Sequence, residues 1–236
     1  MYIALKMKTI IVIPYRKRQS HLLYFIKNSA PLLKKNIPNL EILIVEQDNK
    51  FKFNRGKLLN IGFHYYDYKL YNNTYNYIFH DVDINPIHKS IIKKYKDPVK
   101  NGLIQGIYNN SYSLGGVFKF NAYTFRKTNG YPNNFWGWGY EDDCLQQRAK
   151  IVNVNIRKMI LTTNPKISKY FKIFNNINDR ITFGYNAKKI IGKKVMKSNK
   201  QIKIKYVKYS GLNTLRYKIN KKIKVNNYIT VIQVSL

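Results

Sequence analysis

Three consecutive carboxylates, Glu141, Asp142 and Asp143, stand out in a chain that has 11 acidic residues against 43 basic ones. Carboxylates held close together raise one another's pKa, which is one way to make a general base that works near neutral pH. The preceding segment, 136–139, alternates tryptophan with glycine and holds both tryptophans of the chain. An indole suits the apolar face of a sugar ring. A buried aromatic turn before the acidic first turn of a helix explains the same pattern, and both interpretations stay open here.

A second acidic motif, Asp81-Val82-Asp83, follows an apolar segment, 77–80, that we expect to be a strand. Motifs of this kind occur often by chance. This one is more informative because it lies at the carboxyl end of an expected strand, where α/β proteins bind their ligands. Arg16 and Arg18 follow the first expected strand, and guanidinium groups there can pair with diphosphate oxygens. Ordinary surface basicity also explains them in so basic a chain.

The elements that must position these motifs alternate between strands and helices. Hydrophobic patterning predicts strands over residues 8–14, 41–46, 77–80 and 113–120 and helices over residues 18–35, 54–66 and 142–150. Pro31 should perturb the first helix, and strands and loops should alternate after residue 151. This order predicts an α/β sheet with right-handed crossovers. Pro14, Gln47 and Asp81 all lie at carboxyl ends of expected strands, so the motifs after them should converge on one crevice.

Length and composition bound the class of protein. A chain of 236 residues with 44% hydrophobic content suggests one domain with a sizeable core. No apolar run reaches about 18 residues, so no membrane-spanning helix is expected, and the start lacks the features of a signal peptide. The single cysteine, Cys144, excludes an internal disulfide and fits a reducing compartment. Neither a P-loop nor a GxSxG motif occurs, which argues against the enzyme classes that depend on them.

The formal net charge of +32 is compatible with attraction to nucleic acid, to an anionic membrane or to an acidic glycan. The basic residues are spread along the chain, however, and Lys, Asn, Ile and Tyr are over-used together, as the coding bias of an AT-rich genome produces. We favour this second explanation and expect no nucleic-acid partner. Peripheral contact with an anionic membrane stays open. Such a composition fits a giant DNA virus or an AT-rich microbe.

Four ordered blocks resemble the signature segments of the β-1,4-galactosyltransferase family, most closely its xylosylprotein branch. They are residues 13–18 (IPYRKR), 53–63 (FNRGKLLNIGF), 80–83 (HDVD) and 131–143 (YPNNFWGWGYEDD), and residues 211–215 (GLNTL) match a later family segment. The resemblance implies an α/β fold of the GT-A type with a mixed, mainly parallel central sheet. It also implies a single domain over residues 1–236, with a donor-binding half over about 8–120 and an acceptor-binding and catalytic half over about 121–236.

The activity that the resemblance implies is inverting transfer of galactose from a UDP-sugar to a hydroxyl of a glycan acceptor. Asp142 matches the family's catalytic base, and Trp138, Glu141 and Asp143 match its acceptor-binding residues. Phe53 is expected beside the uracil, whereas Asn60 and Gly62 fall inside an expected helix and are interpreted as structural. The donor-binding residues implied in this way are Pro14, Tyr15, Arg16, Arg18, Phe53, Arg55, Asp81, Asp83, Ser113, Gly116 and Trp138.

The resemblance further implies a divalent cation, most simply Mn²⁺, held by Asp83 against the diphosphate. Here the sequence departs from the xylosylprotein branch, because Asn176 and Asn178 stand where that branch has histidines, and no histidine follows His88. Amide oxygens are harder ligands than imidazole and suit Mn, Mg or Ca. A weakly bound metal, Asp179 as a substitute ligand and the absence of a metal are the alternatives. The histidines that the chain has are interpreted as ordinary core or surface residues.

A second departure lies at Ser113, because related galactosyltransferases have a tyrosine two residues before the Gly115-Gly116 pair. That tyrosine closes the pocket beside C2 of the donor sugar, so a serine should admit UDP-GalNAc beside UDP-galactose. Alternatively, the side chain of Tyr108 or Tyr112 closes the pocket beside C2 in place of that tyrosine, and the sequence favours neither possibility.

Family members are usually anchored in the Golgi membrane. This sequence shows no anchor or stem, so we expect a monomer in the cytoplasm or in the cytoplasm of a host cell. A catalytically degenerate sugar-binding or nucleotide-binding relative is the alternative to an enzyme, as is a transferase for another UDP-hexose.

Overall fold

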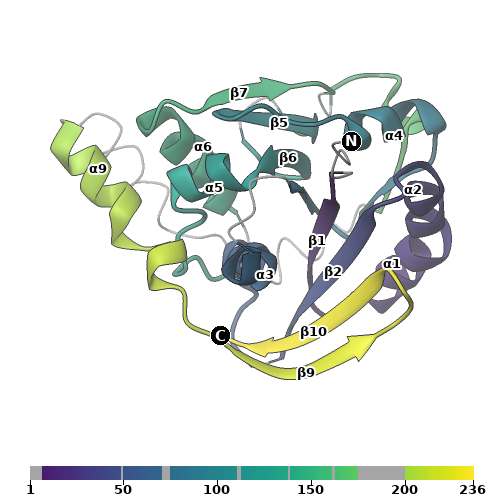
Figure 1. Cartoon of the computed structure of the whole chain (residues 1–236), viewed down its shortest axis with the longest axis horizontal. Coiled ribbons are helices and arrows are strands. Elements are labelled where there is room, and N and C mark those ends of the chain that lie inside the picture. The colour runs from purple at the N-terminus through teal and green to yellow at the C-terminus, as the bar shows by residue number, and fades with distance from the viewer. Residues whose placement is uncertain are drawn as a thin grey trace, which may run out of the picture.

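The structure is a computed structural model that describes residues 7–48, 50–70, 75–110, 113–137, 139–160, 163–174 and 200–236. Its centre is a sheet with the strand order β7-β5-β6-β3-β1-β2-β10-β9, and a separate ribbon pairs β4 with β8 (Figure 1). The strands are β1 (Thr9–Tyr15), β2 (Leu40–Gln47), β3 (Asn76–His80), β4 (Ile84–Pro86), β5 (Leu103–Tyr108), β6 (Val117–Asn121), β7 (Asn155–Lys158), β8 (Phe171–Ile173), β9 (Lys218–Lys224) and β10 (Ile229–Ser235).

Four neighbouring strands at the centre of the sheet run parallel, since β1 pairs in parallel with β2 and β3, and β2 with β10. β6 is antiparallel to both β3 and β5, β7 is parallel to β5, and β9 is antiparallel to β10. Only β6 and β9 therefore run against the other strands of this sheet. The expected mixed, mainly parallel α/β sheet is confirmed.

Both faces of β1 are buried, which explains why its sequence is a continuous apolar run. Ile10 and Val12 belong to one hydrophobic cluster with residues of α3, α5 and α6, and Ile11 and Ile13 belong to a second cluster with residues of η1, α2 and α4. The helices that cover the sheet are α1 (Gln19–Tyr24), η1 (Phe25–Ser29), α2 (Ala30–Asn36), α3 (Arg55–Leu70), α4 (Lys89–Lys96), α5 (Ala122–Thr128) and α6 (Glu141–Ile151). Figure 1 shows these two groups on opposite sides of the sheet.

The first helical segment contains a π-helical stretch, η1, between α1 and α2. Pro31 follows at the start of α2. Proline has no N–H to donate and its ring crowds the carbonyl one turn earlier, and a wider turn relieves that crowding. The expected perturbation at Pro31 is thus confirmed. The wider turn also places Ser29, which is fully buried, so that its hydroxyl donates to Asn85 Oδ1 of β4 at 3.0 Å.

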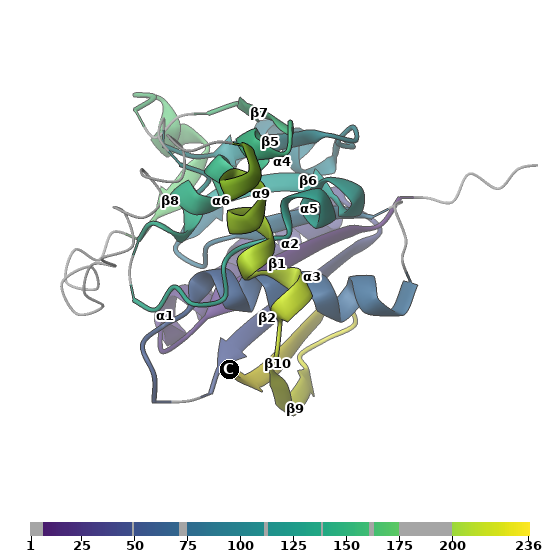
Figure 2. The ribbon, with the colours of Figure 1, turned by 90° about the vertical axis from the view of Figure 1, so that its left-hand side faces the viewer.

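Two expected elements differ from the observed ones. The strand expected over residues 113–120 begins only at Val117, because Gly116 has a φ of +88° and its N–H donates to the Asp81 side chain instead of extending the sheet. The strands expected after residue 151 are present as β7, β8, β9 and β10, but the expectation of strands and loops alone is wrong at α9 (Lys200–Tyr209), which is a helix. Figure 2 shows α9 running in front of α6, on which it packs. We predicted none of β4, β5, α4 and α5.

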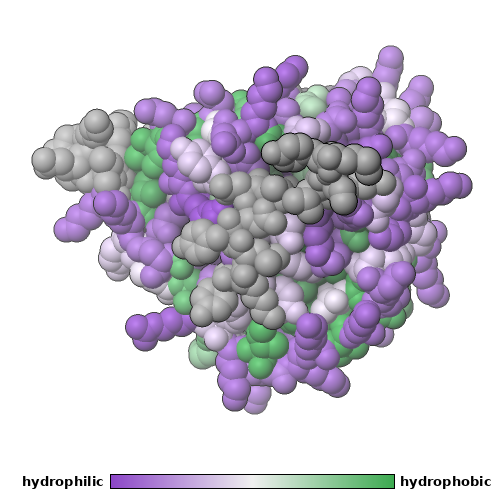
Figure 3. All heavy atoms as spheres, in the orientation of Figure 1, coloured by the Kyte–Doolittle hydropathy of each residue, from purple (hydrophilic) through white to green (hydrophobic). Residues whose placement is uncertain are grey.

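Basic residues cover the exposed edge of the sheet. All seven residues of β9 are exposed, and its sequence is KINKKIK. Lysines on an edge strand discourage pairing with another chain. Figure 3 shows hydrophilic side chains over much of the described surface on the face that it displays, with hydrophobic side chains between them, as expected for a charge that is spread along the sequence. Every helix within the described ranges is too short or too polar to cross a membrane.

Candidate functional site

The candidate site lies where β1, β2, β3 and β5 end and β6 begins, because all five of these strand ends lie at the same edge of the sheet. Arg16 and Arg18 follow β1, the acidic motif at Asp81 and Asp83 follows β3, and Gly116 precedes β6. The first turn of α6 adds the three consecutive carboxylates. Contacts between these segments confirm that the sequence blocks converge at one edge of the sheet.

Asp81 is held through both of its carboxylate oxygens. Arg55 Nε donates to Oδ1 at 2.7 Å, and the Gly116 N–H donates to Oδ2 at 3.1 Å. The φ of Gly116 lies in the left-handed region, and a Cβ built on it lies 2.4 Å from the Tyr108 carbonyl oxygen. Only glycine fits this close approach. The glycine pair in the sequence thus fixes the loop that holds the first carboxylate of the motif.

Asp83 lies 3.2 Å from Arg18 Nη1, and its backbone carbonyl accepts from the Phe174 N–H at 2.9 Å. Burial first, and then the neighbouring charge of Asp81, raise the pKa of Asp83 to about 6 against the opposing effect of Arg18. Asp81 and Asp83 share this site, and the charges of Arg18 and Arg55 do not offset the free energy needed to ionise both carboxylates. Tyr108 lies near both carboxylates. Burial first, and then the charges of Asp83 and Asp81, raise the pKa of its phenol.

Glu141 begins α6 and is buried, with Oε1 3.3 Å from Arg55 Nη1. The preceding residue, Tyr140, has a φ of 75°, so the chain turns sharply into the helix. Burial, followed by the charge of Asp142, raises the pKa of Glu141 to about 7, although Arg55 opposes the shift. Arg55 therefore joins the two acidic motifs, and the cluster does contain a carboxyl whose pKa lies near neutrality.

Asp142 is the next residue of α6, and each of its oxygens accepts a hydrogen bond. The Asp143 N–H donates to Oδ1 at 2.9 Å, and the Ser113 hydroxyl donates to Oδ2 at 2.9 Å. A Cβ built on Gly115 lies 2.5 Å from Oδ2, so a side chain there forces this carboxylate to move. The helix and the loop before β6 together fix the orientation of Asp142.

The aromatic segment before α6 lies against the loop that leads into α3. The Gly137 N–H donates to the Phe53 carbonyl at 2.8 Å, and the rings of Trp136 and Phe51 are 5.6 Å apart. Gly137 and Gly139 have φ values of 91° and 94°, so the glycines are needed for the turn itself. Trp138, expected to bind both substrates, lies outside the described residues.

The remaining predicted residues fall into three groups. Pro14 and Tyr15 are buried in β1, and Phe53 packs against the core, whereas Arg16 donates to the Phe51 carbonyl. Asn60 and Gly62 are structural as expected: Asn60 binds the backbone of Tyr131, and Gly62 lies against the Val12 side chain. Asn176, Asn178 and Asp179, the predicted and substitute metal ligands, and Tyr112, one of the two tyrosines considered at the donor pocket, lie outside the described residues.

Sequence analysis missed several residues of the site. Lys158 at the end of β7 donates to the Asn110 carbonyl at 3.0 Å. It lies close enough to Asp142 and Asp143 for their charges to oppose the lowering of its pKa by burial. Asn110 in turn accepts from the Ser113 N–H at 2.7 Å. Neither residue type stands out in a chain this rich in Lys and Asn. The position of Lys158 at a strand end was the one available signal, and we did not predict β7.

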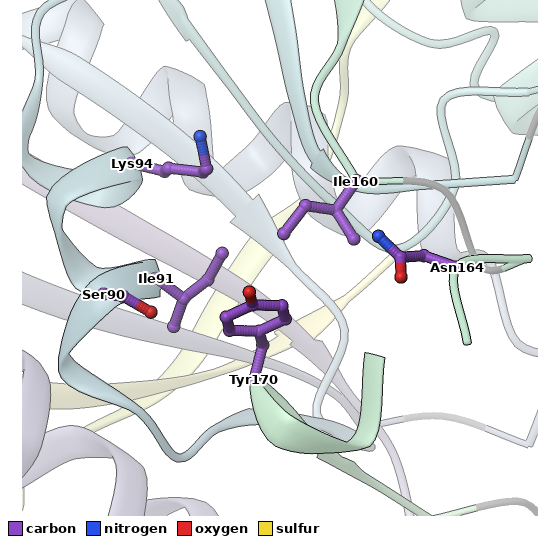
Figure 4. Close-up of a pocket in the computed structure, with 6 residues that line it drawn as sticks. All are labelled: Ser90, Ile91, Lys94, Ile160, Asn164 and Tyr170. Atoms are coloured by element: carbon purple, nitrogen blue, oxygen red, sulfur yellow. The ribbon is translucent and has the colours of Figure 1, made fainter. Parts of the chain in front are cut away.

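A separate hollow of about 230 Å³ lies between α4 and the segments that follow β7. Figure 4 shows the side chains that line it, Ser90, Ile91, Lys94, Ile160, Asn164 and Tyr170. Neither acidic motif contributes to this hollow. The candidate site is thus defined by its converging charged groups and not by the depth of a pocket.

Comparison with known proteins identifies the group to which this arrangement belongs. Residues 3–94 match the N-terminal region of glycosyl transferase group 7, and residues 104–176 match a domain described as the N-terminal domain of galactosyltransferase. The chain belongs to the β-1,4-galactosyltransferase family. Human β-1,4-galactosyltransferase 4 is 34% identical over 171 residues, which are 70% of this chain and 48% of that protein. The chain thus spans about half the length of that relative.

One relative from fruit fly extends the comparison, as a sequence and as a crystal structure. β-1,4-Galactosyltransferase 7 of Drosophila melanogaster is 27% identical over 221 residues, which are 91% of this chain and 64% of that protein. A crystal structure of a mutant of the Drosophila enzyme, in complex with manganese, UDP-Gal and xylobiose, matches with a TM-score of 0.74 at 24% identity. The match covers 98% of this chain and 94% of that one. It confirms the expected GT-A type fold.

Proposed function

We propose that this family member is an inverting galactosyltransferase that moves galactose from UDP-galactose to a hydroxyl group of a glycan acceptor. The observation that carries the proposal is the position of Asp142. Its carboxylate is held from two sides, and Arg55 links its neighbour Glu141 to Asp81. A single displacement requires a base for the acceptor hydroxyl and, near the leaving diphosphate, carboxylates that can hold a cation.

Asp142 acts as the general base in this proposal. It takes the proton of the acceptor hydroxyl while the acceptor oxygen forms a bond to the anomeric carbon of the donor. The bond from that carbon to the diphosphate oxygen breaks, and its electron pair leaves with UDP. Attack from the face opposite the leaving group inverts the anomeric configuration. Glu141, Asp143 and Trp138 are proposed to hold the acceptor.

Asp83 fits a divalent cation, because its carboxylate shares a site with Asp81 where burial already disfavours two negative charges. Hard oxygen ligands suit Mn²⁺ or Mg²⁺. Among the described residues no group of three or more His, Cys, Asp and Glu side chains is arranged to hold a metal. Asn176 and Asn178 are the further ligands that we propose. Once bound, the cation neutralises charge on the departing diphosphate.

Arg16 and Arg18 are proposed to bind the diphosphate, because they directly follow β1 and Arg18 already lies beside Asp83. Phe53 is proposed to lie beside the uracil. The complex of the Drosophila relative with UDP-Gal, manganese and xylobiose supports this choice of donor, cation and acceptor class. UDP-GalNAc is a second proposed donor, for the reason given at Ser113.

The test is release of UDP from UDP-galactose in the presence of Mn²⁺ and a xyloside acceptor, in unmodified protein and in Asp142→Asn. The variant should bind UDP with unchanged affinity and turn over at least about 10²-fold more slowly, the scale of a lost general base. Asp97→Asn is the matched control, since Asp97 is an exposed acidic residue between α4 and β5. Equal turnover in Asp142→Asn removes Asp142 from the mechanism, and no transfer by unmodified protein refutes the proposal.

A further inference from the structure

Ser113 makes a contact that its predicted role at the donor sugar does not require. Its hydroxyl lies 2.9 Å from Asp142 Oδ2, and only 3% of the residue is exposed. Within its own loop, the Ser113 N–H donates to Asn110 Oδ1 at 2.7 Å, and the hydroxyl oxygen accepts from the Gly115 N–H at 3.4 Å. The contact with Asp142 reaches beyond this loop and joins it to the first turn of α6.

From this geometry we propose that Ser113 is a positioning residue for the base, whose hydroxyl fixes the carboxylate of Asp142 toward the acceptor. The inference rests on the proposed function and adds a residue to its mechanism. Asp142 Oδ1 is held by the Asp143 N–H of its own helix, so Ser113 supplies the second point of attachment. Two points stop the carboxylate from rotating about its Cβ–Cγ bond, and a fixed orientation is what proton transfer requires.

The Ser113 hydroxyl also has a second place for its proton. Its oxygen lies 3.1 Å from Asn110 Oδ1, and it can donate to only one partner at full strength. When Asp142 takes the acceptor's proton, its Oδ2 becomes able to donate to Ser113 Oγ. The serine proton then turns to Asn110 Oδ1, so no buried group is left without a partner. The three side chains thus suit both protonation states of the base.

Several charged groups surround Asp142 and act on it independently of Ser113. Glu141 and Asp143 flank it on α6, Lys158 faces it from β7, and Tyr131 lies nearby. These groups are unchanged when Ser113 is replaced, so a comparison of Ser113 variants isolates the hydroxyl.

The first experiment needs no activity. The orientation of the Asp142 carboxylate is determined in crystal structures of unmodified protein, Ser113→Ala and Ser113→Thr. In Ser113→Ala the carboxylate should leave its present orientation or occupy more than one, because one of its two hydrogen bonds is lost, and Ser113→Thr should restore a single orientation. An unchanged single orientation in Ser113→Ala overturns the contact as the cause, whether or not the protein transfers galactose.

The second experiment measures transfer by the same variants. In Ser113→Ala, kcat should fall about tenfold with KM for UDP-galactose unchanged, and Ser113→Thr should recover most of kcat. A changed orientation of the carboxylate with unchanged kcat overturns the positioning role alone. Absence of transfer by unmodified protein refutes the proposed function, while the crystal structures still decide the contact. If Ser113→Ala does not fold, Ser113→Cys replaces it, because a thiol is a much weaker donor.

Discussion

The guanidinium of Arg55 donates to the carboxylate of Asp81 at 2.7 Å, and its second nitrogen lies 3.3 Å from Glu141. One α3 side chain thus ties the motif after β3 to the first turn of α6. Its own pKa is raised well above the usual value, because the charges of Asp81 and Glu141 outweigh the opposing effect of burial. The guanidinium of Arg55 therefore links the acidic motif after β3 to the carboxylates of α6.

We therefore expect Arg55→Met to lower the free energy of unfolding by about 3–5 kcal/mol, because it leaves two largely buried carboxylates close together without a cation. The measurement is urea denaturation at pH 7. Lys8→Met is the control, because it removes a more exposed ion pair with Glu41 and should cost less than about 1 kcal/mol. A loss in Arg55→Met as small as in the control contradicts the bridging role.

Glu141→Gln should make stability less dependent on pH. Burial raises the pKa of Glu141 from 4.5 to about 7, so the folded state favours the neutral acid. The stability from this group is full below pH 4.5 and is lost as the pH rises through about 7. A glutamine does not titrate, and its carbonyl can still accept from Arg55. The advantage of the variant should thus grow between pH 5 and pH 8 by on the order of 2 kcal/mol. A pH-independent difference in urea denaturation contradicts this.

Chelation should abolish transfer, and Mn²⁺ should restore it. Because amides replace histidines at positions 176 and 178, restored activity should need more metal than a relative with histidine ligands needs. Asn176→His should lower the Mn²⁺ concentration at half-maximal activity, since imidazole is a good ligand for this metal. Asn164→His is the control, because Asn164 lines the separate hollow. Full activity in EDTA ends the idea of a metal-dependent reaction.

Ser113 should also widen donor choice, with measurable transfer from UDP-GalNAc beside UDP-galactose. A serine leaves space that an N-acetyl group can fill, and a filled space is favoured over an empty one. Of the two tyrosines considered as a replacement wall, Tyr108 is the one that the structure describes, and it lies near Asp81 and Asp83. A donor screen of unmodified protein, Ser113→Tyr and Tyr108→Ala separates the two. Ser113→Tyr should shift use toward galactose, whereas strict galactose specificity in unmodified protein shows that another residue guards C2.

The sequence predicted β1, β2 and β3 of the parallel centre because these strands are continuous apolar runs that end at recognisable polar motifs, whereas β10 was not predicted. It also predicted that these motifs converge, since the carboxyl ends of parallel strands meet at one edge. The elements that we missed lack such signals. α4 (KSIIKKYK) is short and half of its residues are lysine. α9 follows a lysine-rich stretch in which a helical pattern is hard to distinguish from general basicity.

The chemistry of the site was less predictable than its location. That Asp81 would be held by Arg55 and by the Gly116 N–H depends on three segments far apart in the chain. That Glu141 and not Asp142 would be the more deeply buried carboxylate depends on how α6 packs, because adjacent helical residues face different neighbours. Spacing along a sequence cannot show which of three consecutive acids the fold buries.

The position of β10 has a consequence for the making of the protein. This strand lies next to β2 inside the sheet, yet its residues come from the far end of the chain. A ribosome therefore delivers β2 (LEILIVEQ) long before its neighbour exists, and pairings between such distant segments form slowly. Until then the nascent chain carries an apolar strand with one open edge, the kind of segment that chaperones protect from aggregation. The lysines of β9 can discourage pairing with another chain only after β9 and β10 have joined the sheet.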